Sequence, residues 1–541
     1  MATSEHEKYF LWFSDIHFDP YYATYQGYSA DDVCNIPSLP TIGKHGCDSP
    51  EALVRSAFQT AVDVVANAPT DPSFIIVTGD SIRHGMDLLF INHTETPINY
   101  HALANSSHYL EAMDTAGHVM KNLSTILHEY FPETQIIVSV GNNDVVPDYY
   151  LELKEENSAL GNLSLSVEDV GMLGVLYDAL NDNSTKNRAI LTRDDEWTFL
   201  RGGYYSRMLH DGKLIILSLN TVLYASYYEP LPVYAEDPGK QFLWMKKMLG
   251  YAKEIKCQVV IIGHIPPTIG SFRHNQFWKD DYVKTYYTLI EEFDDVVIAQ
   301  LFGHLHSDEF RVGDLSMTQM NSDTETQMIP SLSSPLLLGP SVTPIHGNHP
   351  AFRLVKYGAV GGNKKYNDGR FKLLDYESYS YLMNTNQTWE KLYTFSDLYA
   401  SNYNIEEGLS SKTMRSIVKS MENTIHRQES ATFSSFRAFV KSGASGSQYA
   451  GFGVACDEQC KEEWICTIIS ATRNGFDNCL VSRRDSREKA KGLLVIAMFA
   501  IVGAVAAFTF VIRQRRASKR SCYEETPSVE GGAGLALEID K

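Results

Sequence analysis

Residues 296–306 read VVIAQLFGHLH, an apolar run that ends in Gly303-His304-Leu305-His306. The run is short and a glycine follows it, which predicts a buried strand over 296–302. Four other predicted strands also end in polar residues: 9–13 before Ser14-Asp15-Ile16-His17, 74–77 before Thr78-Gly79-Asp80, 135–140 before Gly141-Asn142-Asn143-Asp144, and 258–262 before Gly263-His264. In α/β sheets, ligands bind outside the carboxyl ends of the strands. The sequence therefore predicts one site of carboxylate, amide and imidazole groups at a sheet edge.

The same strands indicate the fold class. Together with a sixth predicted strand over 214–219, they alternate with helix-like stretches, and this order predicts a layered α/β fold. Ser49-Pro50 and Asp237-Pro238 each place a capping side chain before a proline. These pairs predict helices over 50–66 and 238–253.

After about residue 360 the sequence becomes rich in Tyr, Asn and Ser, and then helical. We therefore expect a catalytic domain over 8–360 and a C-terminal subdomain over 361–482, instead of more of the same sheet. Four cysteines cluster in this second part: Cys456, Cys460, Cys466 and Cys479. Their spacing does not match common zinc ribbons, so it favours a small disulfide-linked unit in an oxidising compartment.

Residues 492–512 read GLLVIAMFAIVGAVAAFTFVI and contain no charge. This length predicts a single membrane-spanning helix, followed by a polar tail over 513–541. Basic residues flank both ends equally, so they do not decide the orientation. No signal peptide is visible at the N-terminus, yet the cysteines favour a body that is luminal (in a vacuole or lysosome-like compartment) or extracellular. Glycosylation sequons begin at Asn92, Asn105, Asn122, Asn162, Asn183 and Asn386.

The chain is acidic, with 47 Lys and Arg against 66 Asp and Glu in 541 residues and a formal net charge of −19. Binding of nucleic-acid polymers needs a basic surface and is not expected. An anionic, phosphate-containing substrate is still compatible with a locally positive pocket. Oxygen and imidazole donors suit two divalent ions, which would supply that positive charge.

Each polar motif is common by itself, but five of them occur in the order Asp-x-His, Gly-Asp, Gly-Asn, Gly-His and Gly-His-x-His. This order resembles the calcineurin-like metallophosphoesterase superfamily. Three longer segments resemble its acid sphingomyelinase-like branch: IIGHIPP (261–267), FGHLHSDEF (302–310) and GPSVTPIHGNHPAFRLVKY (339–357). The likeness covers about residues 8–480. A further Gly-Asn-His at 347–349 stands in the wrong place in the order, and we interpret it as backbone near the rim of the site.

The resemblance implies a layered β-sandwich flanked by helices, with two metal ions. One ion would be held by Asp15, His17, Asp80 and His306, and the other by Asp80, Asn142, His264 and His304. Zinc is the first choice, with Mn, Fe or Co as alternatives. The two ions would deprotonate a bridging water that attacks phosphorus in line. The resemblance also implies the disulfides Cys456–Cys460 and Cys466–Cys479, and pairing of Cys34 with Cys47 would leave Cys257 free.

Asn143 departs from the superfamily, in which a histidine follows Gly-Asn and assists the leaving group. An amide cannot deliver a proton, so one general acid is missing unless His84 takes that task. Alkoxide leaving groups need protonation far more than phosphate does, which favours phosphoanhydride cleavage. Arg83 adds a guanidinium suited to phosphate oxygens, with a structural salt bridge as its alternative role.

Gly-Asn-Asn-Asp and Gly-Asp-x-x-Arg-His both resemble vacuolar endopolyphosphatases, although those proteins are generally anchored near the N-terminus. We therefore predict a phosphohydrolase that cleaves phosphoanhydride or phosphodiester bonds, with inorganic polyphosphate as the leading substrate. One alternative is an acid sphingomyelinase-like phosphodiesterase acting on sphingomyelin or nucleotides. Another alternative is a non-catalytic membrane receptor on the same scaffold. Loss of metal ligands would indicate such a receptor, but all seven predicted ligands are present.

Overall fold

The computed structural model describes residues 7–24, 34, 36–70, 72–90, 107–153, 171–181, 189–210, 212–227, 236–313, 334–360, 370–422, 430–444 and 456–521. The chain forms two units, Met1–Cys479 and Leu480–Lys541. The predicted strands, site motifs and disulfides all lie in the first unit. The sequons at Asn92, Asn105, Asn162 and Asn183 lie outside the described residues.

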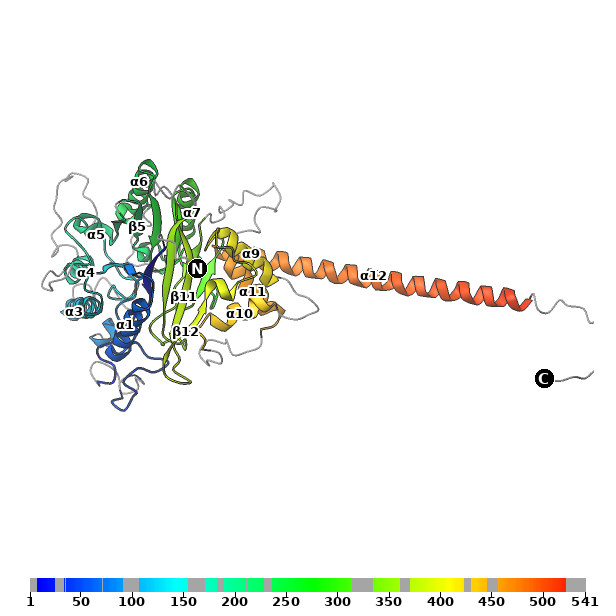
Figure 1. Ribbon diagram of the computed structural model, residues 1–541, viewed down its shortest axis with the longest axis horizontal. Coiled ribbons are helices and arrows are strands. Elements are labelled where there is room, and N and C mark those ends of the chain that lie inside the picture. Colours follow the sequence, from blue (N-terminus) through cyan, green and yellow to red (C-terminus); the bar gives the residue numbers. More distant parts are fainter. Residues whose placement is uncertain are drawn as a thin grey trace, which may run out of the picture. The chain divides into compact units, whose positions relative to one another are not determined.

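Two mixed six-stranded sheets form the centre of the first unit (Figure 1). The first sheet has the order β12 (Trp389–Thr394), β11 (Arg370–Tyr381), β10 (Ala351–Val360), β1 (Glu7–Phe13), β2 (Pro72–Val77), β3 (Gln135–Val138). The second has the order β4 (Tyr205–Leu209), β5 (Leu214–Ser218), β6 (Gln258–Ile262), β7 (Val297–Phe302), β9 (Leu336–Leu338), β8 (Glu309–Arg311). The Tyr205 hydroxyl joins the sheets through hydrogen bonds to the backbone of Val138. The predicted layered α/β class is confirmed.

The six predicted strands are present and differ from the prediction by at most two residues at either end. Strands β1, β2 and β3 are parallel, and so are β5, β6 and β7. Phe13 pairs with Val77, and Val77 with Val138, so the first three strands end at one level. Their apolar residues are buried on both faces, which explains why continuous apolar runs predicted them.

Helices cover the sheets on several sides (Figure 1). The helices of the first unit are α1 (Glu51–Ala66), α3 (Ser107–Tyr130), α4 (Met172–Leu180), α5 (Glu196–Gly202), α6 (Gln241–Glu254), α7 (Asp280–Glu292), α8 (Phe395–Leu398), α9 (Ser411–Glu422), α10 (Ala431–Phe439) and α11 (Glu458–Ile469), with short 3-10 turns at Asp87–Leu89, Thr221–Tyr224 and Pro238–Lys240. A further helix, α12 (Arg473–Ser521), begins in the first unit and lies mostly in the second. The helix predicted from 238 begins at Gln241, after a 3-10 turn over 238–240, and the Asp237 carboxylate accepts hydrogen bonds from the backbone N–H groups of Phe242 and Leu243 in its first turn. Ser49 was expected to cap α1, but Pro50 is the residue at its N-cap and no side chain caps this helix.

The expectation that the sheet stops near residue 360 is wrong. Strands β11 and β12 extend the first sheet beyond β10: β11 pairs antiparallel with β10, and β12 pairs antiparallel with β11. Burial in β11 alternates along much of its length, because one face packs inward while the other is partly exposed. Polar and aromatic residues therefore alternate in the sequence, and no continuous apolar run marks the strand. The helices α9–α11 follow only after this extension.

The disulfides of the described residues are Cys34–Cys47, Cys456–Cys460 and Cys466–Cys479. Cys257 is buried and carries a free thiol. The two C-terminal pairings implied by the resemblance are confirmed, and so is the free state of Cys257.

The second unit contains most of α12. Val495–Ala517 is long and apolar enough to cross a membrane, with a mean hydropathy of 2.7 in its most apolar part. This span overlaps the predicted 492–512 segment. The polar tail beyond Ser521 lies outside the described residues.

Candidate metal centre

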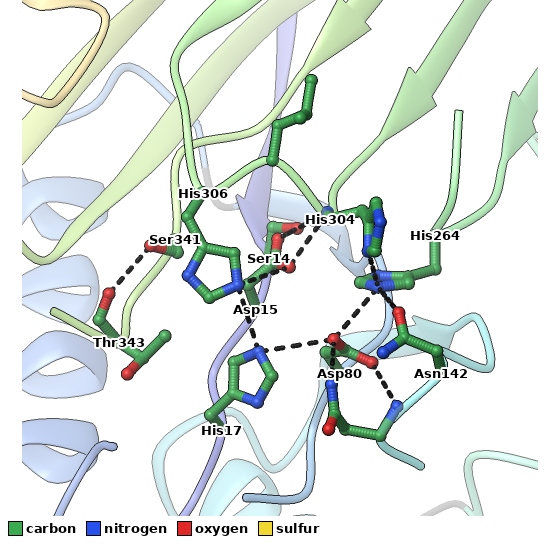
Figure 2. Close-up of polar contacts among 12 residues, drawn as sticks. Ser14, Asp15, His17, Asp80, Asn142, His264, His304, His306, Ser341 and Thr343 are labelled. Carbon is green, nitrogen blue, oxygen red and sulfur yellow. Dashed lines mark hydrogen bonds and ion pairs between the residues drawn. The ribbon is translucent and has the colours of Figure 1, made fainter. Parts of the chain in front are cut away.

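Loops that follow β1, β2, β3, β6 and β7 bring the seven predicted ligands together (Figure 2). Five of the seven have a positive backbone φ: Asp15 (48°), His17 (45°), Asp80 (51°), His304 (74°) and His306 (50°). Residues other than glycine rarely adopt this conformation, and strained residues of this kind cluster at functional sites.

The first predicted ligand set surrounds the Nε2 atoms of His17 and His306. These two nitrogens lie 3.2 Å apart. His17 Nε2 is 3.4 Å from Asp80 Oδ2, and His306 Nε2 is 3.3 Å from Asp15 Oδ1. The four side chains are almost fully buried. They converge from three loops on one small volume.

The second predicted set meets at His264. Its Nε2 lies 3.1 Å from Asp80 Oδ2, 3.0 Å from Asn142 Oδ1 and 3.3 Å from His304 Nδ1. Asp80 Oδ2 is thus shared between the two sets, as Figure 2 shows. A carboxylate between two groups of donors suits a bridge between two cations.

The histidine tautomers fit metal binding. His17 Nδ1 lies 3.1 Å from the Ile82 carbonyl oxygen, and His264 Nδ1 lies 2.8 Å from that of Thr78. Only a protonated Nδ1 can donate to these carbonyls, so Nε2 is the nitrogen of each ring that faces the centre. This is the usual arrangement of histidines that bind metals.

The electrostatics also call for a cation. Burial lowers the pKa of His17 and of His304 to about 3, so both rings stay neutral, as metal ligands must. Burial and the nearby Asp80 raise the pKa of Asp15 to about 7, although the charge of His264 partly opposes them. Two buried carboxylates this close therefore cannot both ionise easily without added positive charge. The donor set fits divalent ions of the Zn, Mn, Fe or Co class.

Glycine is required in these motifs because the loops touch. A Cβ on Gly303 would lie 2.6 Å from Asp15 Oδ2 and would collide with the Ser14 hydroxyl. A Cβ on Gly141 would collide with the backbone nitrogen and carboxylate of Asp80. The glycines before Asn142 and His304 thus allow neighbouring ligand loops to approach closely.

His84 lies beside the first set, where its ring stacks on His17 at a centroid distance of 3.8 Å. Asp48 holds it in place: the two Asp48 oxygens accept from the His84 backbone N–H and from Nδ1, each at 2.9 Å. Burial by itself lowers the pKa of His84, but the charge and hydrogen bond of Asp48 outweigh it and raise the pKa to about 9. The ring therefore carries a proton at neutral pH.

Asn143 and Arg83 were predicted to act on the substrate, but the contacts below are with other groups of the protein. The Asn143 amide donates to Asp80 Oδ2 at 2.8 Å, and its backbone N–H donates to Asp80 Oδ1 at 2.8 Å. Asn143 therefore orients the carboxylate that the two predicted ligand sets share. Arg83 is buried, and its Nε donates to the His84 carbonyl and lies 3.8 Å from Asp19. These contacts favour the structural salt bridge over a role in binding phosphate.

Sequence reasoning missed three residues near the centre. Asp48 directly precedes Ser49-Pro50, which was interpreted only as the start of a helix, and Asp48 itself was given no role. Asp144 accepts backbone hydrogen bonds from Ser81, Ile82 and Gly141, and so ties two ligand loops together. The exposed His346 places its ring 4.6 Å from that of His306. Its position beside the Gly-Asn-His at 347–349 was the available signal.

The 339–357 segment does lie against the site. Val342 and Thr343 donate backbone hydrogen bonds to the Ser14 and Asp15 carbonyls. The Asn348 amide is buried and donates to Ser341, Thr343 and His349, so it serves the backbone as expected.

Comparisons with known proteins agree with this geometry. The family described as calcineurin-like phosphoesterase matches residues 8–308. "Sphingomyelinase phosphodiesterase D" of Dictyostelium discoideum is 28% identical over 61% of this chain and 61% of its own length. "Sphingomyelin phosphodiesterase A" of the same organism is 26% identical, covering 87% of this chain and 68% of its own length. The human "Cyclic GMP-AMP phosphodiesterase SMPDL3A" is 26% identical over 86% and 88%. The chain belongs to the calcineurin-like phosphoesterase family of metal-dependent phosphoric ester hydrolases, and its relatives are acid sphingomyelinase-like phosphodiesterases.

Proposed function

We propose that this protein is a metal-dependent phosphodiesterase in which His84 protonates the leaving oxygen. The observation that carries the proposal is the hydrogen-bonded pair of the buried Asp48 and the half-buried His84, whose ring stacks on His17. Asp48 fixes Nδ1 of the ring, so Nε2 is the nitrogen that can give up a proton. General acids of this kind accelerate such reactions by about 10²–10⁴-fold.

We assign the two ligand sets to two divalent ions. Asp15, His17, Asp80 and His306 would hold one, and Asp80, Asn142, His264 and His304 the other, with zinc as the first choice. When bound, the ions neutralise phosphoryl oxygens and activate a water. The chain itself orients the ligands: Asn143 holds Asp80, and the Ile82 and Thr78 carbonyls hold His17 and His264.

A general acid at His84 would supply the proton that Asn143 cannot, and this changes which substrate is favoured. The sequence favoured polyphosphate because Asn143 cannot protonate an alkoxide. With a charged His84 at the centre, an alkoxide can leave as the alcohol, which brings sphingomyelin-like diesters within reach. The names of the relatives point to sphingomyelin and cyclic GMP-AMP, and both are phosphodiesters. Phosphodiester cleavage is therefore our first choice.

Endopolyphosphatase activity is the second candidate. It is favoured by Asn143, whose amide takes the place of a histidine that diester cleavage would use. Cleavage of a phosphoanhydride needs no acid, because phosphate leaves readily.

We further propose that Val495–Ala517 anchors the protein in a membrane and that the body is luminal or extracellular. The length and hydropathy of the span and the three disulfides support this placement. Two sequons lie within the described residues, at Asn122 on α3 and at Asn386 between β11 and β12. Both asparagines are exposed, so both could carry glycans.

The test uses the full chain in detergent, freed of metal and reloaded with Mn, Co or Zn. It is incubated separately with sphingomyelin in mixed micelles, cyclic GMP-AMP and long-chain polyphosphate. Release of phosphocholine or linear nucleotide with intact polyphosphate supports the phosphodiesterase. Mid-chain shortening of polyphosphate without diester cleavage would instead establish the second candidate. His304→Ala is the control for contaminating hydrolases.

A further inference from the structure

Lys441 is a buried lysine behind the metal centre. It lies two residues beyond α10, and only 8% of its surface is exposed. Its Nζ donates to the carbonyl oxygens of Leu305 (3.3 Å) and His306 (3.1 Å). It thus reaches the backbone of the Gly-His-x-His loop from a segment 135 residues further along the chain.

Burying a lysine is costly unless charge or hydrogen bonds compensate for it. Burial lowers the pKa of Lys441 to about 8, while the negative charges of Glu309 and Asp15 oppose that effect. The two carbonyl oxygens accept the ammonium protons at hydrogen-bond distance. An apolar side chain would be buried here at a lower cost in free energy than lysine. The presence of a lysine therefore suggests that its ammonium group has a specific role.

The loop that Lys441 contacts is strained. His304 and His306 both have positive φ, at 74° and 50°. Such conformations persist only where the surroundings fix them. The His304 N–H donates to the Asp15 carboxylate, which fixes the beginning of the loop. The Leu305 carbonyl accepts from the Ser307 hydroxyl as well as from Lys441, and the His306 carbonyl accepts from Lys441.

The backbone next to Lys441 holds the same region. The Val440 carbonyl accepts from the Asp308 N–H at 2.9 Å, and the Lys441 carbonyl accepts from the His349 N–H at 3.4 Å. Residues 440–441 therefore clamp the stretch after β7 against the 339–357 segment. The C-terminal helical region thereby takes part in the geometry of the site.

We propose that Lys441 is a positioning residue that holds His304 and His306 in the geometry needed to bind metal. This inference rests on the metal centre of the proposed function. Hydrogen-bond partners of metal ligands typically contribute about 10- to 100-fold to metal affinity. Lys441 acts through the backbone of its two neighbours and is not a catalytic residue.

The test compares Lys441→Met and Lys441→Gln with the wild-type full chain in detergent. Methionine keeps an apolar stem of similar length and removes the ammonium, whereas glutamine keeps N–H donors. Lys461→Met is the matched control: Lys461 is also buried, in α11, and among the described contacts it donates no hydrogen bond to the 304–306 loop. Metal-free protein is titrated with Mn²⁺ by calorimetry, bound metal is counted, and the melting temperature of each metal-free variant is recorded.

We expect Lys441→Met to bind Mn²⁺ about 10- to 100-fold more weakly than the wild type, with Lys441→Gln in between and Lys461→Met near the wild type. Unchanged Mn²⁺ affinity in Lys441→Met would overturn the inference. Equal losses in both methionine variants, matched by equal falls in melting temperature, would also overturn it, since they would indicate general destabilisation. If Lys441→Met does not fold, Lys441→Gln decides: weaker Mn²⁺ binding at a native melting temperature supports the inference, and wild-type affinity contradicts it. These outcomes are separate from the proposed function, because a wild type that binds two ions but cleaves no diester would refute the function alone.

Discussion

Replacing Asp48 with asparagine removes the charge that keeps a proton on His84. The present pKa of His84, about 9, is the balance of burial, which lowers it, and of Asp48, the largest of the influences that raise it. Without Asp48 we expect the pKa to return to the ordinary value of 6.5 or below it. At about pH 7.5, the charged fraction of the ring would then fall from nearly all to about a tenth.

The consequence depends on the leaving group. Hydrolysis that requires His84 as an acid should be retained below its pKa and lost as the pH rises through about 9. In Asp48→Asn this alkaline limb should move to lower pH. At about pH 7.5, kcat/KM for an alkyl diester such as sphingomyelin should fall roughly tenfold or more. A p-nitrophenyl diester expels a stable phenolate and should be affected little.

The assay measures kcat/KM for both substrates between mildly acid and alkaline pH in the wild type, Asp48→Asn, His84→Gln and the double variant. The double variant should be no slower than His84→Gln, because the two residues act as one unit. Equal losses on the two substrates would refute the general-acid role and would point to a merely structural pair. If the alkaline limb of the pH profile is unchanged in Asp48→Asn, the Asp48 charge does not raise the pKa of His84 as we infer.

Further predictions concern the ligands and the free thiol. His304→Ala should lose all turnover and one ion per chain, measured by metal counting; substantial activity would contradict the ligand assignment. Gly303→Ala should bind metal more weakly than the wild type, because its methyl group would press on the Asp15 carboxylate; wild-type affinity by calorimetry would contradict the packing argument. Burial raises the pKa of the Cys257 thiol to about 11. The eighth cysteine, Cys522, follows the described residues and is replaced by serine so that it does not react. In this variant a thiol reagent should label Cys257 only after unfolding, and rapid labelling of the native protein would disprove its burial.

The parallel strands and the residues after them could be predicted from the sequence because each signal is local. A continuous apolar run marks a strand buried on both faces, and the ligand follows it within four residues. Strands β11 and β12 gave no such signal, since partial exposure of one face breaks the apolar run. The domain boundary expected at residue 360 was drawn from that missing signal.

Residues that act through long-range contacts could not be predicted. Asp48 meets His84 across 36 residues, and Lys441 meets His306 across 135. Neither contact leaves a pattern in its own neighbourhood. Asn143 was recognised as unusual, but the direction of its amide, toward Asp80, depends on how two loops pack. The sequence therefore predicted which groups lie together at the candidate centre, but not the contacts that hold them there.

The backbone strain at the centre explains why so many supporting contacts are present. Five ligands in left-handed conformations would each relax if their loops were free. Asp144 ties the loops after β2 and β3, Asp15 fixes the N–H of His304, and Lys441 fixes the carbonyl of His306. These contacts tie the ligand loops to one another and to the rest of the fold, and they supply the restraint that the strained backbone needs.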